Sequence, residues 1–169
     1  ASPKNAAAAR EAAERLGMKI HSVLAGWVNF NQPSAVAGDL AAVETAILAA
    51  QAYGAKAILL VPCRIDGMPV PDPWQFDIRF DEKSGHVRQV VAGDNTRYAA
   101  YIEAQNHATD ASREAIKRLL PTAEKTGVVV AVENVWNNLW VMPDLFRNFV
   151  ASFDSPCVNY CRAGGYKRL

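Results

Sequence analysis

The sequence predicts an α/β protein built on a parallel sheet, because helical and strand-like segments alternate along it. The helical pattern is clearest at 39–54, where apolar residues recur every three or four positions until Gly54. The next segment, AKAILLVP at 55–62, is a continuous apolar run of the kind buried on both faces of a parallel sheet. Repetition of this order indicates right-handed crossovers between neighbouring strands.

The other elements follow the same alternation. Helices are expected at 5–16, which Gly17 ends, at 97–126, which Pro121 bends or divides, and at 143–153, which begins at Pro143. Strands are expected at 18–26, 127–132 and 155–160. We treat residues 1–169 as one partial domain.

Residues 63–96 form an insertion between the second strand and the helix that follows it. Within them, FDIRFD and HVRQVV alternate apolar and polar residues on either side of EKSG, which predicts a β-hairpin. Connections of this length in compact domains are usually binding loops or lids, so we expect the insertion to form part of a site wall.

Composition excludes several classes of partner. The formal net charge is +1, so neither nucleic acid nor an anionic membrane surface is an expected ligand. No apolar run approaches the ~20 residues that span a bilayer. The three cysteines show no metal-binding spacing, and their odd number favours a reducing, cytoplasmic setting. The chain begins without Met, so it carries no information about an export signal.

Candidate site residues gather where the predicted strands end. They are the aromatic Trp27 and the polar residues Asn29, Arg64, Glu133 and Asn134. No glycine-rich phosphate fingerprint follows any strand, which disfavours an open dinucleotide-binding sheet. A (β/α)8 barrel places its chemistry at the carboxyl ends of its strands but needs ~250 residues. With about four strands, this chain supplies roughly half of such a barrel.

Four segments resemble a known family in order and spacing: IHSVLAG, AKAILLVP, AEKTGVVVAVENVWNNL and LFRNFVASFDSP. The chain resembles the sugar phosphate isomerase/epimerase family, whose members are xylose isomerase-like TIM barrels related more distantly to apurinic endonucleases. The resemblance implies that the chain supplies strands three to six, with the β-hairpin after strand four. It also implies a small sugar substrate, phosphorylated or not, and a divalent cation, Mn²⁺ or Mg²⁺ first and Zn²⁺ or Co²⁺ as alternatives.

Glu133 carries the predicted chemistry. Sugar isomerisation and epimerisation remove a proton next to a carbonyl, and a hard cation held by carboxylates stabilises the enediolate. The resemblance makes Glu133 both a metal ligand and an acid/base. It also implies an Asp at the end of strand six, where this sequence has Arg162, which cannot ligate a cation. The sequence therefore shows one ligand of the expected four.

Trp27, Asn29, Arg64 and Asn134 are expected to line the substrate pocket, and His21, placed within a strand, is expected to face the barrel interior. Each has a structural alternative. His21 would be a core residue, and Arg64 would pair with Asp66 or Asp72. Asn134, with Asn137, would cap the following turn.

Two tryptophans follow Glu133. Trp136 is a candidate wall against a sugar face, whereas packing is favoured for Trp140.

Two other functions compete with the isomerase or epimerase. A truncated or degenerate barrel would bind without catalysis and would associate through exposed strand edges, so a homo-oligomer is compatible with the sequence. A metal phosphoesterase like the apurinic endonucleases is less favoured, because it needs strand-end histidines and a basic groove, and the chain has three His.

Overall fold

The computed structural model describes residues 3–134 and 137–160. In chain order the elements are α1 (Pro3–Arg15), β1 (Ser22–Trp27), α2 (Val36–Tyr53), β2 (Ala57–Val61), β3 (Phe76–Phe80), β4 (Val87–Val91), η1 (Thr96–Tyr98), α3 (Ala99–Thr126), β5 (Val129–Val132), α4 (Pro143–Ala151) and β6 (Val158–Tyr160). None of the helices in these ranges combines the length and the apolar character needed to cross a membrane.

The predicted parallel sheet is present. Its strand order is β1-β2-β5-β6, and each neighbouring pair runs in parallel. Gly54 ends α2 in the left-handed conformation that glycine adopts without strain, as the sequence predicts. Pro121 does not divide the long helix, because α3 runs unbroken from Ala99 to Thr126.

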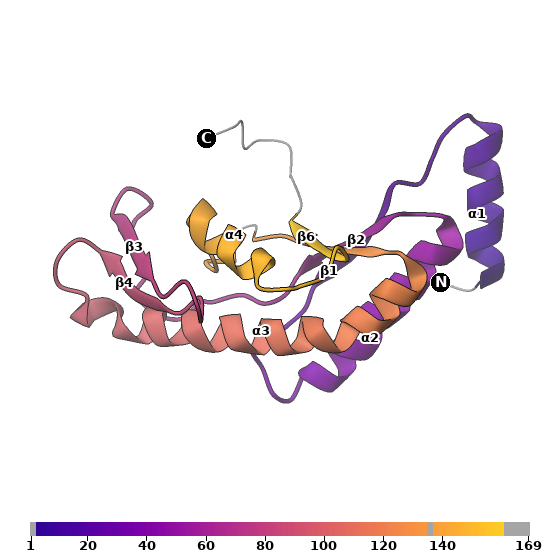
Figure 1. The fold of residues 1–169 in the computed structure, drawn as a ribbon. Coiled ribbons are helices and arrows are strands. Elements are labelled where there is room, and N and C mark those ends of the chain that lie inside the picture. The colour runs from indigo at the N-terminus through magenta and orange to yellow at the C-terminus, as the bar shows by residue number, and fades with distance from the viewer. Residues whose placement is uncertain (1–2, 135–136, 161–169) are drawn as a thin grey trace.

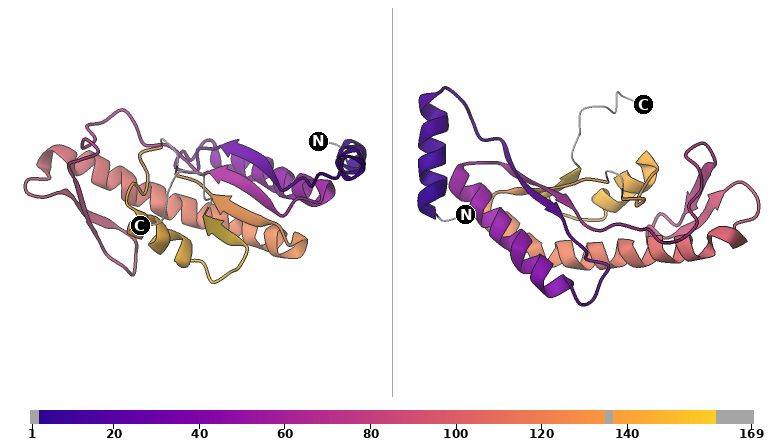
Figure 2. Two further views of the ribbon diagram at one scale, coloured as in Figure 1. Left: turned by 90° about the horizontal axis from the view of Figure 1, so that it is seen from above. Right: turned by 180° about the vertical axis from the view of Figure 1, so that it is seen from behind.

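The first strand starts later than expected. The sequence predicts a strand from residue 18, but β1 begins at Ser22. The reason is the position of α1, which packs against α2 and stands apart from the sheet (Figures 1 and 2). Residues 16–21 are needed to span the distance between that helix and the strand.

Helices α2 and α3 cover one face of the sheet (Figure 1). The strand residues on this face are buried: Ile58, Leu60, Val130, Val132 and Val158. They pack with the apolar stripe of α2 and with one side of α3 in a single core. This burial of aliphatic side chains is the main stabilising contribution to the sheet.

The opposite face lacks such a covering layer among the described residues. In-register positions on it are only partly buried or are exposed: Ser22, Leu24, Ala57, Leu59, Val129, Ala131 and Asn159. Leu24 is 72% exposed. In a closed barrel these positions would point into the barrel interior.

A β-bulge in β1 determines the direction of its last residue. The register with β2 shifts between Leu24 and Gly26, and Gly26 has φ +88°, a conformation that favours glycine. After the shift, Trp27 pairs with Val61, two residues beyond Leu59. The bulge therefore turns Trp27 to the same open face as Leu24.

The predicted hairpin, β3–β4, lies beyond the carboxyl ends of the sheet strands, along the amino-terminal half of α3 (Figure 1). His86 Nε2 lies 2.9 Å from Asp110 Oδ2, and Arg113 Nη2 donates to the Ser84 carbonyl at 2.8 Å. From α4, Asn148 Nδ2 donates to the Glu82 carbonyl at 2.8 Å. The hairpin turn is thus attached to two helices.

Truncation of Leu60 tests the core. Leu60 is fully buried at the centre of the helix-covered face. Leu60→Ala should lower the free energy of unfolding by about 2–5 kcal/mol, because it removes buried methyl groups and leaves a cavity. Urea denaturation measures the change. The matched Leu48→Ala, at a half-exposed position on α2, should have an effect below about 1 kcal/mol, and equal losses in both variants would contradict the assignment of the core.

Candidate active site at the carboxyl edge of the sheet

Glu133 lies at the carboxyl end of β5 and on the open face. It follows Ala131 by two positions, and its backbone N–H continues the ladder by donating to the Leu60 carbonyl at 2.9 Å. The side chain is partly buried. Among residues 3–134 and 137–160, nothing forms a hydrogen bond or ion pair with its carboxylate. This carboxylate is therefore available to a ligand.

Trp27 shares this edge with Glu133. Because of the bulge in β1, its ring is on the open face at the carboxyl end of the strand, and it is 49% exposed. Strand β2, which ends at Val61, lies between β1, which carries Trp27, and β5, which precedes Glu133. A large, half-exposed indole on the same open face as the Glu133 carboxylate is a suitable surface for the apolar face of a sugar ring.

Asn29 and Arg64 lie just beyond the ends of β1 and β2, and both are exposed. The Asn29 backbone N–H donates to Asp39 Oδ2 at 2.7 Å, at the start of α2. Arg64 Nε lies 3.2 Å from Asp66 Oδ2, so the predicted alternative pairing with Asp66 is present. An exposed ion pair of this kind is weak and can open for an anionic ligand.

His21 does not lie with the other candidates. The sequence places it within a strand, but β1 begins at the next residue, and the His21 carbonyl accepts from Lys56 N at 3.0 Å. It lies at the amino end of β1, six residues from Trp27, which corresponds to roughly 20 Å in an extended strand. His21 is thus at the opposite edge of the sheet from Glu133.

The loop that follows Glu133 is fixed by hydrogen bonds to α3. Tyr101 Oη donates to the Asn138 carbonyl at 2.7 Å, and Gln105 Nε2 donates to the same carbonyl. Gln105 Oε1 accepts from Trp140 N at 3.4 Å. Asn134 Nδ2 closes the loop from within by donating to the Trp140 carbonyl at 2.9 Å, which engages this side chain in the turn.

Two non-glycine residues of this loop have positive φ, Asn138 at 56° and Trp140 at 50°. Backbone of this kind is maintained only where the surroundings determine it. The Trp140 ring is fully buried, lies 3.8 Å from the Phe149 ring between centroids, and donates from Nε1 to Thr109 Oγ1 at 3.0 Å. The packing role predicted for Trp140 is confirmed, whereas Trp136 lies outside the described residues.

Sequence reasoning missed the α3 residues that hold this loop. Tyr101, Gln105 and Thr109 are spaced four residues apart, so they share one side of the helix, and all three are buried. Burial raises the pKa of Tyr101 to about 12, so its hydroxyl remains a donor at neutral pH. The sequence did contain a signal for this role, namely polar residues spaced four apart on an otherwise apolar face of the helix, because buried polar side chains need hydrogen-bond partners.

Two buried amide atoms have no partner among the described residues: Asn31 Oδ1 and Asn137 Nδ2. Both side chains belong to loops that contact the segment after β2. Asn31 Nδ2 donates to the Arg64 carbonyl at 3.2 Å, and Ile65 N donates to the Asn137 carbonyl at 2.8 Å. The loops after β1, β2 and β5 are therefore joined at the edge that carries Glu133.

Cys63 lies two residues after the end of β2, and its side chain is buried. Burial raises the pKa of its thiol to about 11, and Ser112 Oγ lies 3.6 Å from its sulfur. The thiol is thus protonated at neutral pH, which is typical of a structural cysteine.

The described residues do not by themselves fit a divalent cation. Nowhere in residues 3–134 and 137–160 do three His, Cys, Asp or Glu side chains lie close enough together to hold one. Glu133 is a suitable oxygen ligand, but hard cations require about six. Arg162, which takes the place of the expected Asp, lies outside these ranges.

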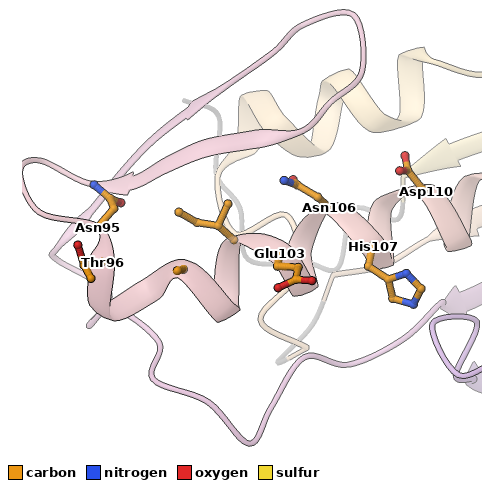
Figure 3. Close-up of a pocket in the computed structure, with 8 residues that line it drawn as sticks. Asn95, Thr96, Glu103, Asn106, His107 and Asp110 are labelled. Carbon is orange, nitrogen blue, oxygen red and sulfur yellow. The ribbon is translucent and has the colours of Figure 1, made fainter.

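A separate open groove of about 610 Å³ runs along the amino-terminal half of α3 (Figure 3). It is lined by Asn95, Thr96, Ala99, Ile102, Glu103, Asn106, His107 and Asp110. It contains none of the candidate residues at the sheet edge. The His107 Nε2 atom of this groove lies 3.0 Å from the Asn31 carbonyl, so His107 supports the loop after β1.

The fold, with its polar carboxyl edge, corresponds to half of a (β/α)8 barrel. The chain belongs to the xylose isomerase-like TIM barrel family, which matches residues 1–162. The resemblance found in the sequence is confirmed. No curated protein sequence matches the chain.

Solved structures with this fold are about twice as long as this chain. A D-tagatose 3-epimerase-like protein superposes with a TM-score of 0.62 at 17% identity, over 94% of this chain and 50% of its own. A 3-keto-D-glucoside 4-epimerase from E. coli superposes with a TM-score of 0.59 at 13% identity, and the match covers 92% of this chain and 52% of the epimerase. A mannonate dehydratase from Streptococcus suis superposes with a TM-score of 0.54 at 16% identity, and the match covers 92% of this chain and 50% of the dehydratase. The chain thus spans about half the length of these structures.

Removal of the Gln105 side chain tests the anchoring of the loop. Gln105→Ala should lower the free energy of unfolding by about 1–3 kcal/mol, because buried partners in the loop lose a hydrogen bond. It should also increase hydrogen exchange at residues 137–140. Gln51→Ala, at an exposed position of α2, is the matched control and should change neither. Unchanged exchange in Gln105→Ala would contradict the anchoring role.

Proposed function

We propose that the chain supplies the catalytic edge of a sugar isomerase or epimerase, which exchanges a proton on a carbon next to a carbonyl. The observation that carries the proposal is the position of Glu133, on the open face at the carboxyl end of β5, with no partner for its carboxylate among the described residues. Membership of the xylose isomerase-like family supports a site at this edge. Two of the similar structures are named as a 3-epimerase-like protein and a 4-epimerase.

Glu133 acts as the acid/base. A carboxylate that removes a proton must reach the substrate, and Glu133 is only partly buried and forms no ion pair with Lys or Arg among the described residues. Trp27 provides the apolar surface against the sugar ring. Exposed Arg64 and Asn29 are placed to contact hydroxyl or phosphate groups, and the α3 network maintains the loop beside the carboxylate.

A divalent cation, Mn²⁺ or Mg²⁺, would stabilise negative charge on the substrate oxygen. In this proposal Glu133 contributes one ligand, and the others come from outside the described residues.

Solvent exchange tests the role of Glu133. In D2O the protein should introduce deuterium next to the carbonyl of a ketose, which NMR of a panel of ketohexoses and ketopentoses, with and without Mn²⁺, would detect. Glu133→Gln keeps the size of the side chain but removes the base, so exchange should fall by about 100-fold or more.

Glu114→Gln is the control for this experiment. Glu114 is an exposed carboxylate on α3, paired with Lys117 and remote from the sheet edge, so its removal should leave exchange unchanged. Equal exchange by the wild type and Glu133→Gln would rule out Glu133 as the base.

A further inference from the structure

We propose that Arg113 is a positioning residue, which couples the turn of the β3–β4 hairpin to the loop that follows Glu133. The guanidinium group of Arg113 lies where α3, α4 and the hairpin turn meet, and its side chain is 16% exposed. The coupling itself does not depend on the proposed function. Only its consequence, that the hairpin helps to maintain the surroundings of a catalytic Glu133, rests on that function.

Every nitrogen of the Arg113 guanidinium has an acceptor. Nη1 donates to Asp110 Oδ1 at 2.9 Å within α3, and Nη2 donates to the Ser84 carbonyl at 2.8 Å in the hairpin turn. Nε donates to Ser152 Oγ at 3.3 Å, at the residue that follows α4. A planar guanidinium holds its donors in fixed directions. Because the three acceptors belong to three elements, the position of this group depends on all of them together.

The hairpin turn packs closely against this group. Gly85 has φ +76°, a conformation that favours glycine, and a Cβ atom there would lie 3.1 Å from Arg113 Nη2 and 3.2 Å from Asn148 Oδ1. His86 Nε2, in the same turn, lies 2.9 Å from Asp110 Oδ2, so the carboxylate that binds Arg113 also holds the turn. Movement of the turn would therefore displace the Arg113 side chain.

Aromatic rings continue the contact from Arg113 to the loop after β5. Arg113 Cζ lies 5.8 Å from the centroid of the Phe149 ring, within the range of a cation–π interaction. The Phe149 ring in turn stacks on the Trp140 ring at 3.8 Å between centroids. The Trp140 carbonyl accepts from Asn134 Nδ2 at 2.9 Å, and Asn134 directly follows Glu133. Contacts thus run from the hairpin turn to the neighbour of Glu133.

Hydrogen exchange, followed by mass spectrometry on the whole chain, tests the coupling because it reports local opening. The amides of Leu139 and Trp140 donate to Asn137 Oδ1 and Gln105 Oε1 in the structure. In Arg113→Ala they should exchange about tenfold faster, which corresponds to about 1.4 kcal/mol. The amides of β2 should keep their wild-type rates, because the core of the sheet is not involved.

Two further variants separate geometry from charge. Arg113→Lys keeps the positive charge beside Asp110, but an ammonium group cannot donate in the three fixed directions of a guanidinium. It should therefore exchange at Leu139 and Trp140 as fast as Arg113→Ala does. Arg118→Ala removes an exposed arginine from the same helix and is the matched control, with wild-type exchange expected throughout.

A perturbation from the hairpin side tests whether Arg113 carries the effect. Gly85→Ala strains the turn and crowds the guanidinium, so it should also accelerate exchange at Leu139 and Trp140. Added to Arg113→Ala, it should cause no further acceleration there, because the connecting side chain is already absent.

Four results would overturn the proposal. They are wild-type exchange of Leu139 and Trp140 in Arg113→Ala, restoration of the wild-type rates by Arg113→Lys, an equal acceleration in β2, and additive effects of Gly85→Ala and Arg113→Ala. The third result would show a general loss of stability in place of a local coupling. Because no substrate is used, none of these results affects the test of Glu133 by deuterium incorporation.

Discussion

The register between β2 and β5 is the constraint on which the candidate site depends. Ile58 pairs with Val130 and Leu60 with Val132, so these four buried residues share the helix-covered face. The backbone bond from Glu133 to the Leu60 carbonyl extends the same ladder by one residue. Because side chains alternate along a strand, burial of Val132 requires Glu133 to turn toward the open face. A slip of one residue would place the carboxylate in the apolar core.

The rest of the edge depends on interactions that lie outside the sheet. A bulge at Gly26 turns Trp27 to the open face, and buried Tyr101 and Gln105 hold the loop after β5. The left-handed backbone of Trp140 is maintained because its ring is stacked on Phe149 and bonded to Thr109. The site is therefore assembled by α3 and α4 as much as by the strands, so substitutions that disrupt these helices should also alter the loop after β5.

Local patterns allowed the parallel sheet and the hairpin to be predicted, because apolar periodicity and turn residues report burial directly. They also placed Glu133, Trp27 and Arg64 at strand ends. The position of His21 was wrong because strand length depends on where α1 packs, which is a tertiary property. The anchoring by Gln105 could not be predicted either, since it joins residues more than thirty positions apart. Whether Glu133 binds a cation stays a prediction.

The central claim, that Glu133 faces the open side of the sheet while Val132 faces the core, can be tested by cysteine accessibility. Single variants Val132→Cys and Glu133→Cys would be treated with a maleimide under native conditions, and labelling would be measured peptide by peptide by mass spectrometry. We predict rapid labelling at position 133 and labelling at position 132 only after unfolding in urea. Rapid native labelling at position 132 with protection at position 133 would contradict the register and the site built on it.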